Sequence, residues 1–387
     1  FTGLIGVSLF LSLYINFFEP LINTIVLNSP RKLETLDVGW EVLKKVIFDS
    51  PLILHILISA VLVNILMLLF KLTRTLNIDF WNYWNFILVG SVVFAITKIQ
   101  WLGVFTSLVI VVITLVLSDI YAPYIEKYSG IKGISTPQAN IICWAPVSHI
   151  VNLIFNKIPF IGKIKIYFEK IHYKMGIVSQ PMIMGFILGF IIGAISKYQN
   201  FTLALKTNLL FSFSSGLKLS IIMALLPRML NILIKGLASI VSDIRNFTNR
   251  KYPKRIMYIG IDPLIFAGYP SVIFLSTIII PLSVLIATRL PGNTILPRAD
   301  LIIIPLIVLW VIVPSEGDMI RSFISGIVII PVLLLVAGDM ADFFTELFRN
   351  SGLEVVKGYQ KISSMGAGSN VFFWLLLKIL EPFLKLF

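Results

Sequence analysis

Apolar runs long enough to cross a lipid bilayer recur along this chain and constrain its fold more than any other feature. A membrane-spanning helix needs roughly 20 predominantly apolar residues. The longest candidates are Leu4–Ile25, Pro51–Phe70, Trp81–Thr97, Leu102–Leu117, Met175–Ile195, Ser271–Ala287 and Val371–Phe387. Shorter or proline-containing candidates are Phe201–Phe213, Leu219–Ile234, Leu301–Val313 and Phe323–Ala337. The runs predict an all-α integral membrane protein with about ten crossings, some of them incomplete.

The composition agrees with this class and excludes several functions. Only 13% of the residues are charged, whereas a soluble domain carries about 25%. The chain has one cysteine, Cys143, and 3 histidines, which excludes an internal disulfide and a cysteine or histidine metal cluster. No Gly-x4-Gly-Lys-Ser/Thr phosphate-binding loop occurs in the sequence. We therefore expect no ATP hydrolysis by that route and no bound cofactor.

Basic residues gather in two segments, Lys157–Lys174 and Asp243–Arg255, and the formal net charge is +13. In a membrane protein such segments lie on the cytoplasmic side and do not indicate nucleic-acid binding. Attraction to lipid headgroups would place them on the same side. The sequence begins at Phe1 instead of a methionine, so we expect the native chain to begin earlier.

Two apolar segments are interrupted by helix-breaking residues. They are "GISTPQANIICWAP" (Gly133–Pro146) and "GIDPLIFAGYP" (Gly260–Pro270), and both begin Gly-Ile and end in proline. Irregular backbone at membrane depth occurs where it is buried in protein or lines a cavity. Paired interrupted segments in two parts of a chain are typical of a transporter binding site. We expect each segment to enter the membrane, turn back and present half-helix ends to a substrate.

Asp262 is the most informative polar residue in these segments. A carboxylate at the centre of a spanning helix costs about 3 kcal/mol, and such residues usually face a cavity and serve a function. The alternative is that Asp262 only caps a helix that begins at Pro263, because aspartate before proline is a good N-cap. Both roles are compatible, since a capping carboxylate keeps one oxygen for a hydroxylated ligand.

Other polar side chains in the same segments are weaker candidates. Gln138 and Asn140 have amides that can donate and accept hydrogen bonds to hydroxyl groups. Ser135 and Thr136 can do the same or bond back to the preceding turn. The aromatic cluster "FWNYWNF" (Phe80–Phe86) is typical of an interfacial belt, with a ring face for a sugar as the alternative.

Several ordered stretches together resemble one family. They are "LDVGW" (Leu36–Trp40), "TRTLNIDFWNYW" (Thr73–Trp84), "GISTPQAN" (Gly133–Asn140), "IPFIGKIKI" (Ile158–Ile166), "MALLPRM" (Met223–Met229), "IGIDPLIFAG" (Ile259–Gly268), "LPGNTILPRADL" (Leu290–Leu301) and "RSFISGIVI" (Arg321–Ile329). The chain resembles the membrane-spanning enzyme IIC of the bacterial sugar phosphotransferase system, of the galactitol type within the ascorbate–galactitol superfamily. The resemblance runs from near Phe1 to the C-terminus, without the first helix of that family.

The resemblance implies a single membrane-embedded permease domain over residues 1–387 in the bacterial inner (cytoplasmic) membrane. Its two inverted repeats, roughly 1–174 and 175–387, would each contribute a re-entrant hairpin to a sugar site at mid-membrane depth. Such permeases are homodimers in the lipid bilayer. Their transport core moves like an elevator against a dimer scaffold.

The resemblance also implies the chemistry of transport. A phosphocysteine on a separate cytoplasmic enzyme IIB, which is itself supplied by an enzyme IIA, phosphorylates the bound sugar or polyol. The chain would then be the membrane subunit of a sugar phosphotransferase. In the related ascorbate permease, the second hairpin carries an aspartate that binds substrate. Asp262 stands at the matching place and is therefore both the expected substrate ligand and the expected general base.

This chain departs from the galactitol-type pattern at three positions. Those members usually read Pro-His where it reads Pro137-Gln138, Gly-Glu-Pro where it reads Ser179-Gln180-Pro181, and Trp-His where it reads Trp84-Asn85. Gln138 and Gln180 keep the capacity to form hydrogen bonds, but they cannot bind or release a proton. Gln180 joins the expected substrate ligands. The departures imply either a different polyol or sugar, or weakened phosphorylation chemistry.

Two other functions remain open from the sequence. In a secondary transporter, Asp262 would couple a proton to the movement of a polyol or sugar. In a membrane sensor or scaffold, a degenerate pocket would bind ligand without flux. A carrier-dependent, phosphorylated product distinguishes the phosphotransferase hypothesis from both.

Overall fold

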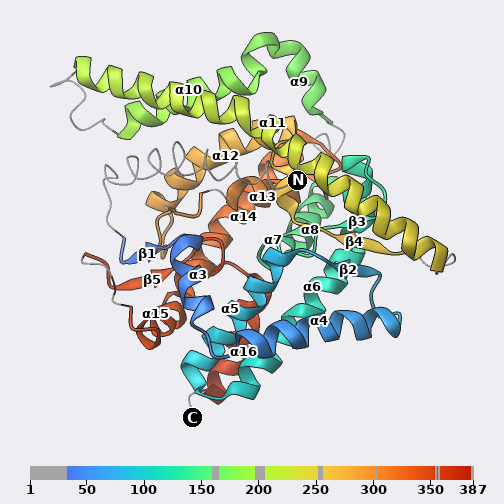
Figure 1. Ribbon diagram of the computed structural model, residues 1–387. Helices are drawn as coiled ribbons and strands as arrows, with labels where there is room; N and C mark the ends of the chain where they lie inside the picture. Colours follow the sequence, from blue (N-terminus) through green and yellow to red (C-terminus); the bar gives the residue numbers. More distant parts are fainter. Residues whose placement is uncertain are drawn as a thin grey trace.

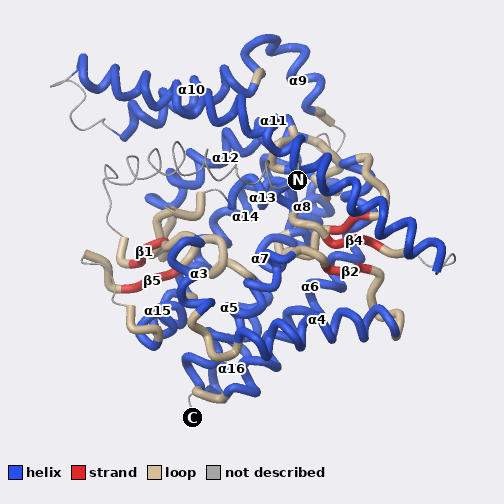
Figure 2. The backbone as a smooth tube through the Cα atoms, viewed as in Figure 1, coloured by secondary structure: helices blue, strands red, loops and turns tan. Residues whose placement is uncertain are grey.

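A computed structural model of the 387-residue chain gives the fold. It describes residues 33–158, 165–196, 205–251 and 256–384, apart from residues 298, 302, 354, 356 and 357. The predicted crossing Leu4–Ile25 therefore lies outside the described residues. In this part of the chain, helices dominate and short strands occur at two places (Figures 1 and 2).

The described helices are α3 (Trp40–Phe48), α4 (Ile53–Leu69), α5 (Phe80–Thr97), α6 (Gln100–Ser129), α7 (Ala139–Ile142), α8 (Ala145–Asn156), α9 (Phe168–Met175), α10 (Pro181–Ser196), α11 (Leu205–Lys251), α12 (Pro270–Arg289), α13 (Ile303–Ile312), α14 (Met319–Asp339), α15 (Ala341–Asn350) and α16 (Val371–Leu384). The 3₁₀ helices are η3 (Gly176–Ser179) and η5 (Pro263–Phe266). The strands are β1 (Thr35–Asp37), β2 (Thr75–Asn77), β3 (Ile134–Ser135), β4 (Tyr258–Gly260) and β5 (Lys361–Ser363).

Six described helices are long and apolar enough to cross a membrane, or up to eight if each of two bent helix pairs counts as one span. The predicted all-α membrane class is therefore consistent with the structure. The count is lower than the expected ten partly because α13 has only 10 residues and the first predicted crossing is not described.

The predicted crossings Phe201–Phe213 and Leu219–Ile234 fall largely within one helix. From residue 205 onward, both belong to α11, which is continuous over 47 residues. At 1.5 Å per residue its length is roughly 70 Å, more than twice the approximately 30 Å hydrocarbon thickness of a bilayer. Part of α11 must therefore lie outside the hydrocarbon core or run oblique to the membrane normal.

Small residues bring α10 and α11 into close contact at the top of Figure 1. A Cβ at Gly189 would lie 2.4 Å from the carbonyl oxygen of Ser215, and one at Gly185 would lie 2.7 Å from that of Leu219. The backbones can approach this closely only because these positions lack side chains. The glycines of α10 thus serve contact within the chain.

A parallel sheet joins three distant parts of the sequence at the right of Figure 2, in the order β2-β4-β3. Asn77 pairs with Gly260 on one side of β4, and Ser135 pairs with Gly260 on the other. A Cβ at Gly260 would lie 2.6 Å from Pro137 Cγ. Glycine is therefore required for the loop after β3 to cross the central strand.

The two interrupted segments predicted from the sequence contain β3 and the end of β4, together with the helices that follow these strands. Gly133–Pro146 forms β3 and α7, turns at Cys143 and Trp144, and continues into α8. Gly260–Pro270 runs from the end of β4 through η5 to the start of α12. Both segments are extended first and helical afterwards, and the structure brings them side by side.

A second parallel pair, β1 with β5, lies at the left of Figure 2. Thr35 of β1 also forms a parallel bridge with Ile295. Between the two strand regions lies a helical core in which Trp144 and Trp310 are fully buried. The two strand regions and this core fix the positions of the loops that carry the polar residues.

Candidate functional site

Three helices begin directly after the three strands of the β2-β4-β3 sheet. Asp79 is the N-cap of α5, Asp262 is the N-cap of η5, and Gln138 is the N-cap of α7. Because the strands are parallel, their carboxyl ends lie at one edge of the sheet. The three side chains and the positive ends of three helices therefore gather at that edge.

Asp262 caps η5 as the sequence predicts. Its Oδ1 accepts a hydrogen bond of 2.7 Å from the backbone N–H of Leu264. The side chain is partly buried, and its other oxygen accepts no hydrogen bond from the described residues. Asp262 thus has the free carboxylate oxygen that a hydroxylated ligand needs.

Asp79 makes the same kind of cap on the neighbouring strand. Its Oδ1 accepts hydrogen bonds from the backbone N–H groups of Trp81 at 3.0 Å and Asn82 at 3.3 Å. Asp79 is only 3% exposed, and its Oδ2 is buried without a partner among the described residues. A second carboxylate oxygen is therefore available at the edge of the sheet.

Two asparagines of α5 extend this polar face. Asn82 Oδ1 accepts a hydrogen bond of 2.8 Å from the backbone N–H of Ala139, and Asn85 Oδ1 accepts one of 2.9 Å from Asn140 Nδ2. The Nδ2 groups of Asn82 and Asn85 are buried and have no partner among the described residues. Both asparagines thus present a free donor.

Asp79, Asn82 and Asn85 are not among the candidates that the sequence predicts, because their aromatic neighbours favour an interfacial belt. The signal that identifies them is their spacing. Residues three apart lie on the same side of a helix, so these three polar side chains form a stripe in an otherwise apolar segment. The departure from the family pattern at Asn85 falls on this stripe.

The predicted residues of the loop after β3 divide into two groups. Ser135 is tied into the sheet, because its Oγ shares a hydrogen bond of 3.0 Å with Thr75 Oγ1. Thr136 Oγ1 and Gln138 Oε1 are buried without a described partner. Both atoms of the Asn140 amide bond to protein, Nδ2 to Asn85 and Oδ1 to Asn370.

The free polar atoms form what we call the strand-end cluster. Its members are Asp79, Asn82, Asn85, Thr136, Gln138 and Asp262. A buried polar group without a partner costs roughly 1–3 kcal/mol, so several at one edge indicate a place where a ligand supplies partners. Amide donors, carboxylate and amide acceptors and a hydroxyl match the hydroxyl groups of a polyol. No group of three or more His, Cys, Asp or Glu side chains in the described ranges could hold a metal ion.

The other strand region has the opposite character. Asp37 accepts hydrogen bonds from the backbone N–H groups of Asp300 at 3.2 Å and Met365 at 2.8 Å. Asp300 accepts one of 3.1 Å from the N–H of Gly366. Asp37 and Asp300 are buried, and their oxygens are not among the buried atoms without partners. These carboxylates hold three loops together, and the described residues around them leave no comparable set of free polar atoms.

Gln180 lies on a different part of the molecule. It follows η3 and precedes α10, and its side chain is exposed. These elements belong to what we call the α9–α11 arm, which consists of α9, η3, α10 and α11 and lies at the top of Figure 1. Its backbone N–H donates to the carbonyl oxygen of Ile177 at 3.1 Å. No described hydrogen bond joins Gln180 to the strand-end cluster, so its role as a substrate ligand stays a prediction.

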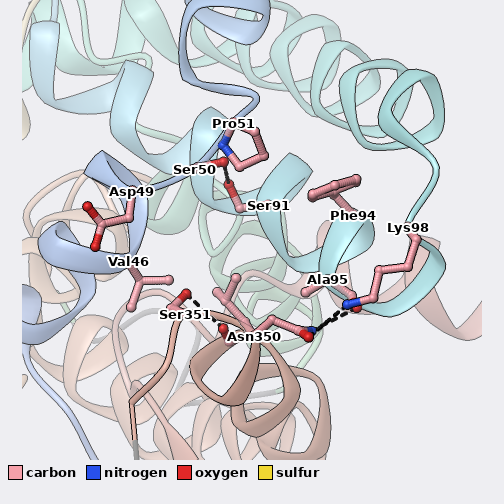
Figure 3. A pocket seen from close by; sticks show the side chains of 11 residues that line it. Val46, Asp49, Ser50, Pro51, Ser91, Phe94, Ala95, Lys98, Asn350 and Ser351 are labelled. Carbon is pink, nitrogen blue, oxygen red and sulfur yellow. Dashed lines mark hydrogen bonds between the residues drawn. The ribbon is translucent and has the colours of Figure 1, made fainter.

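A pocket of about 280 Å³ opens at the far end of α5 (Figure 3). It lies between the bend after α3, the end of α5 and the end of α15. There Lys98 Nζ donates to Asn350 Oδ1 at 2.7 Å, and Ser50 and Ser91 share a hydrogen bond of 2.6 Å. On α5 the pocket is lined from Ser91 onward, twelve residues or about 18 Å along the helix from Asp79, and no residue of the strand-end cluster lines it.

Comparison with known proteins identifies the family. A sequence profile described as "PTS system sugar-specific permease component" matches residues 1–358. Two similar proteins are named "PTS system galactitol-specific EIIC component", from Escherichia coli (strain K12) and from Escherichia coli O157:H7. Each is 29% identical over 383 residues, which cover 98% of this chain and 82% of the relative. A protein of Escherichia coli (strain K12) named as a permease IIC component is 30% identical over 379 residues, with 98% and 84% coverage. The resemblance seen in the sequence is therefore confirmed, and the chain belongs to the family of sugar-specific permease components of the phosphotransferase system.

Proposed function

We propose that this chain binds a sugar alcohol of the galactitol type at the strand-end cluster and carries it across the bacterial inner membrane while a partner phosphorylates it. The observation that carries the proposal is the set of buried donors and acceptors without protein partners at the ends of β2, β4 and β3. A hydroxyl group donates and accepts at once, so a polyol matches such a mixed set. The galactitol-specific names of two similar proteins point to the same substrate class.

Each residue has a role in this proposal. Asp79, Asp262 and Gln138 accept hydrogen bonds from substrate hydroxyls. Asn82 and Asn85 donate to them. Thr136 can do either. The bonded network shifts Asn140 from a direct ligand to a support for Asn85, and Ser135 supports the sheet. Gln180 would have to approach through a movement of the α9–α11 arm.

The proposed chemistry is transfer of a phosphoryl group from the phosphocysteine of a separate enzyme IIB. The S–P bond of the donor breaks, an O–P bond forms at a substrate hydroxyl, and the hydroxyl proton passes to Asp262. Cys143, the single cysteine of the chain, is 1% exposed. A buried thiol suits packing better than phosphoryl transfer, so the reactive cysteine belongs to the partner. Enzyme IIA would reload that partner.

The basic segments provide a docking surface for such a partner. Lys165, Lys170 and Lys174 belong to the first segment, and Lys170 and Lys174 are exposed on α9. Positive charge there would attract an acidic surface on the carrier and offset the charge of its phosphate. Residues 159–164 and 252–255 of these segments lie outside the described part of the chain.

We also propose that the chain contains two inverted repeats, as the family resemblance implies. The strand pairing supports this: β4 of the second half lies between β2 and β3 of the first half, while Thr35 of the first half pairs with both Ile295 and β5 of the second. Each half would thus place one strand between two strands of the other. In a homodimer with an elevator motion, this interlocked unit would move as one body.

A proton-coupled transporter is the second candidate, and the neighbouring carboxylates of Asp79 and Asp262 favour it. Asn77 and Gly260 are paired residues, and each aspartate stands two positions beyond its paired residue. Two carboxylates at the ends of adjacent strands can share a proton because like charges disfavour double ionisation. Such a protein would accumulate free polyol in response to a pH gradient without any phosphoryl donor.

The test is uptake in cells that express the chain with or without its candidate cytoplasmic carrier. The probes are labelled galactitol, other hexitols and pentitols, galactose and ascorbate, and the control is a carrier whose reactive cysteine is replaced by serine. Phosphorylated product that requires the intact carrier supports the proposal and names the substrate. Free polyol that accumulates without the carrier and varies with external pH overturns phosphotransfer in favour of proton coupling. Saturable binding without uptake would identify a sensor.

A further inference from the structure

Asn370 lies at the start of α16 and reaches the strand-end cluster from the other end of the chain. Its Oδ1 accepts hydrogen bonds of 3.1 Å from the backbone N–H groups of Phe372 and Phe373. Its Nδ2 donates to Asn140 Oδ1 at 3.2 Å and to the carbonyl oxygen of Ala139 at 3.3 Å. Because backbone N–H groups can only donate, the amide of Asn370 has a single possible orientation.

The orientation of the Asn370 amide determines the orientations of two further amides. We call the three residues, Asn370, Asn140 and Asn85, the asparagine relay. Since Asn140 Oδ1 accepts from Asn370, Asn140 Nδ2 must face the next residue, where it donates to Asn85 Oδ1 at 2.9 Å. Asn85 then directs its Nδ2 donor away from Asn140, and this group has no partner in the described part of the chain. All three residues are buried, at 2%, 4% and 7% exposure.

We infer that Asn370 determines the hydrogen-bonding character of the polyol site without touching the substrate. As the cap of α16 it fixes the sense of the asparagine relay, so that Asn85 offers a donor to a substrate hydroxyl. This inference rests on the proposed function, and within it Asn370 is a positioning residue. It also explains why an asparagine, which can be turned either way, can serve at position 85 where the family usually has histidine.

The donor of Asn85 does not stand alone. Asn82 Oδ1 accepts from the backbone N–H of Ala139 at 2.8 Å, so Asn82 Nδ2 also points away from that bond as a free donor. The free oxygens of Asp79 and Gln138 supply acceptors at the same edge. The site therefore pairs two amide donors of α5 with separate acceptors, which selects a ligand with several adjacent hydroxyl groups and disfavours one that only donates.

Asn370→Asp tests the relay directly. Aspartate caps a helix as well as asparagine does, so α16 keeps its cap, but the ionised carboxylate has no N–H for Asn140. The Asn140 amide should turn its Nδ2 toward the new carboxylate and its oxygen toward Asn85, whose amide then turns and presents an oxygen to the ligand. We expect affinity for labelled galactitol to fall about tenfold, the effect of one lost hydrogen bond to a buried group.

The experiment is a double-mutant cycle on the full chain in lipid nanodiscs. Asn85→Asp keeps an acceptor toward Asn140 and places an oxygen where the donor was, so it should lower affinity by a similar factor. The double variant should lose no more affinity than either single variant, because the same donor is lost in each. The double variant should lose more stability in thermal unfolding than the two single variants lose together. In the double variant the oxygens of Asn140 and of position 85 would face each other.

Controls separate the relay from folding defects and from the proposed function. Asn350→Asp makes the same chemical change on the exposed end of α15 and should leave affinity unchanged. Asn370→Ser keeps a capping oxygen without the amide, and it replaces Asn370→Asp if that variant does not fold. Additive effects in both binding and unfolding, or wild-type affinity in Asn370→Asp and Asn370→Ser, would overturn the relay. Wild-type protein that binds no polyol overturns the proposed function, and the unfolding cycle then still tests the relay.

Discussion

Asp79 and Asp262 occupy equivalent places at the ends of two neighbouring parallel strands. Their strands pair at Asn77 and Gly260, and each aspartate caps a helix with one oxygen, at 3.0 Å to Trp81 N and 2.7 Å to Leu264 N. The cap fixes the carboxylate, and the second oxygen remains for a ligand. Two rigid acceptors contributed by chain segments far apart in sequence thus meet at the proposed polyol site.

Asp79→Asn should weaken polyol binding and leave the fold intact. Asparagine keeps an oxygen to cap α5, while the free Oδ2 acceptor becomes an N–H₂ donor. We expect a loss of affinity of about tenfold, the effect of one hydrogen bond, measured by binding of labelled galactitol. Asp342→Asn changes an exposed carboxylate that pairs with Lys361 at 2.8 Å and serves as the control. Equal affinities in both variants would remove Asp79 from the site.

Thr136→Val should raise the stability of the ligand-free protein and reduce its affinity for the polyol. The Thr136 hydroxyl is buried without a described partner, so replacing it by a methyl group removes an unsatisfied group worth about 1 kcal/mol or more. Thr114→Val is the matched control, because the hydroxyl of Thr114 bonds the carbonyl oxygen of Ile110 at 2.7 Å. The temperature of thermal unfolding without ligand should rise for Thr136→Val and should not rise for Thr114→Val. A fall in stability for Thr136→Val would contradict the assignment.

Asn64→Leu should destabilise the sheet that carries the site. Asn64 Nδ2 donates to the carbonyl oxygen of Thr75 at 2.9 Å, and Asn64 Oδ1 accepts from Asn77 N at 3.0 Å. The amide therefore pairs the free edge of β2 as a further strand would. Loss of both bonds should lower the free energy of unfolding by roughly 2–4 kcal/mol. Chemical unfolding in detergent measures this, and Ser59→Ala on the exposed side of α4 should have little effect.

Gly189→Leu should separate α10 from α11. A Cβ at this position already lies 2.4 Å from the carbonyl oxygen of Ser215, so a larger side chain forces the helices apart at a cost of about 1–3 kcal/mol. Ile187→Leu on the exposed face of the same helix is the control. Limited proteolysis of the arm should be faster in Gly189→Leu only. Equal protection in both variants would mean that the close contact contributes little to holding the arm.

The sequence could predict the membrane class, the two interrupted segments and the helix cap at Asp262, because each depends on local chemistry. Apolar runs indicate burial in lipid, and the stretch Gly260–Pro263 indicates an extended chain that ends in a helix cap. It could not predict that these segments pair through β4, since strands of two or three residues carry no periodic signal. The bonds from Asp37 to Met365 and from Asn370 to Asn140 depend on tertiary contact alone.

Two parts of the candidate site show how far residue type alone can lead. Asp79, Asn82 and Asn85 recur at helical spacing, but the surrounding aromatic residues favoured the interpretation as an interfacial belt. The chemistry of the Asn140 amide predicts a substrate ligand, and this stays a prediction. The structure uses both ends of that amide to connect Asn370 with Asn85. Residue type reveals hydrogen-bonding capacity, whereas only the fold reveals which groups are already bonded.

The most direct measurement is equilibrium binding of labelled galactitol, and of the other polyols in the uptake panel, to the purified full chain and to Asp262→Asn. Asparagine keeps the cap on η5 and replaces the free carboxylate oxygen, so the two proteins should unfold at similar temperatures. If the strand-end cluster binds the polyol, the wild-type protein binds saturably and Asp262→Asn loses binding at least about tenfold, as expected for a hydrogen bond to a charged group. If Asp262→Asn binds the polyol as tightly as the wild-type protein, the substrate site lies elsewhere in the molecule.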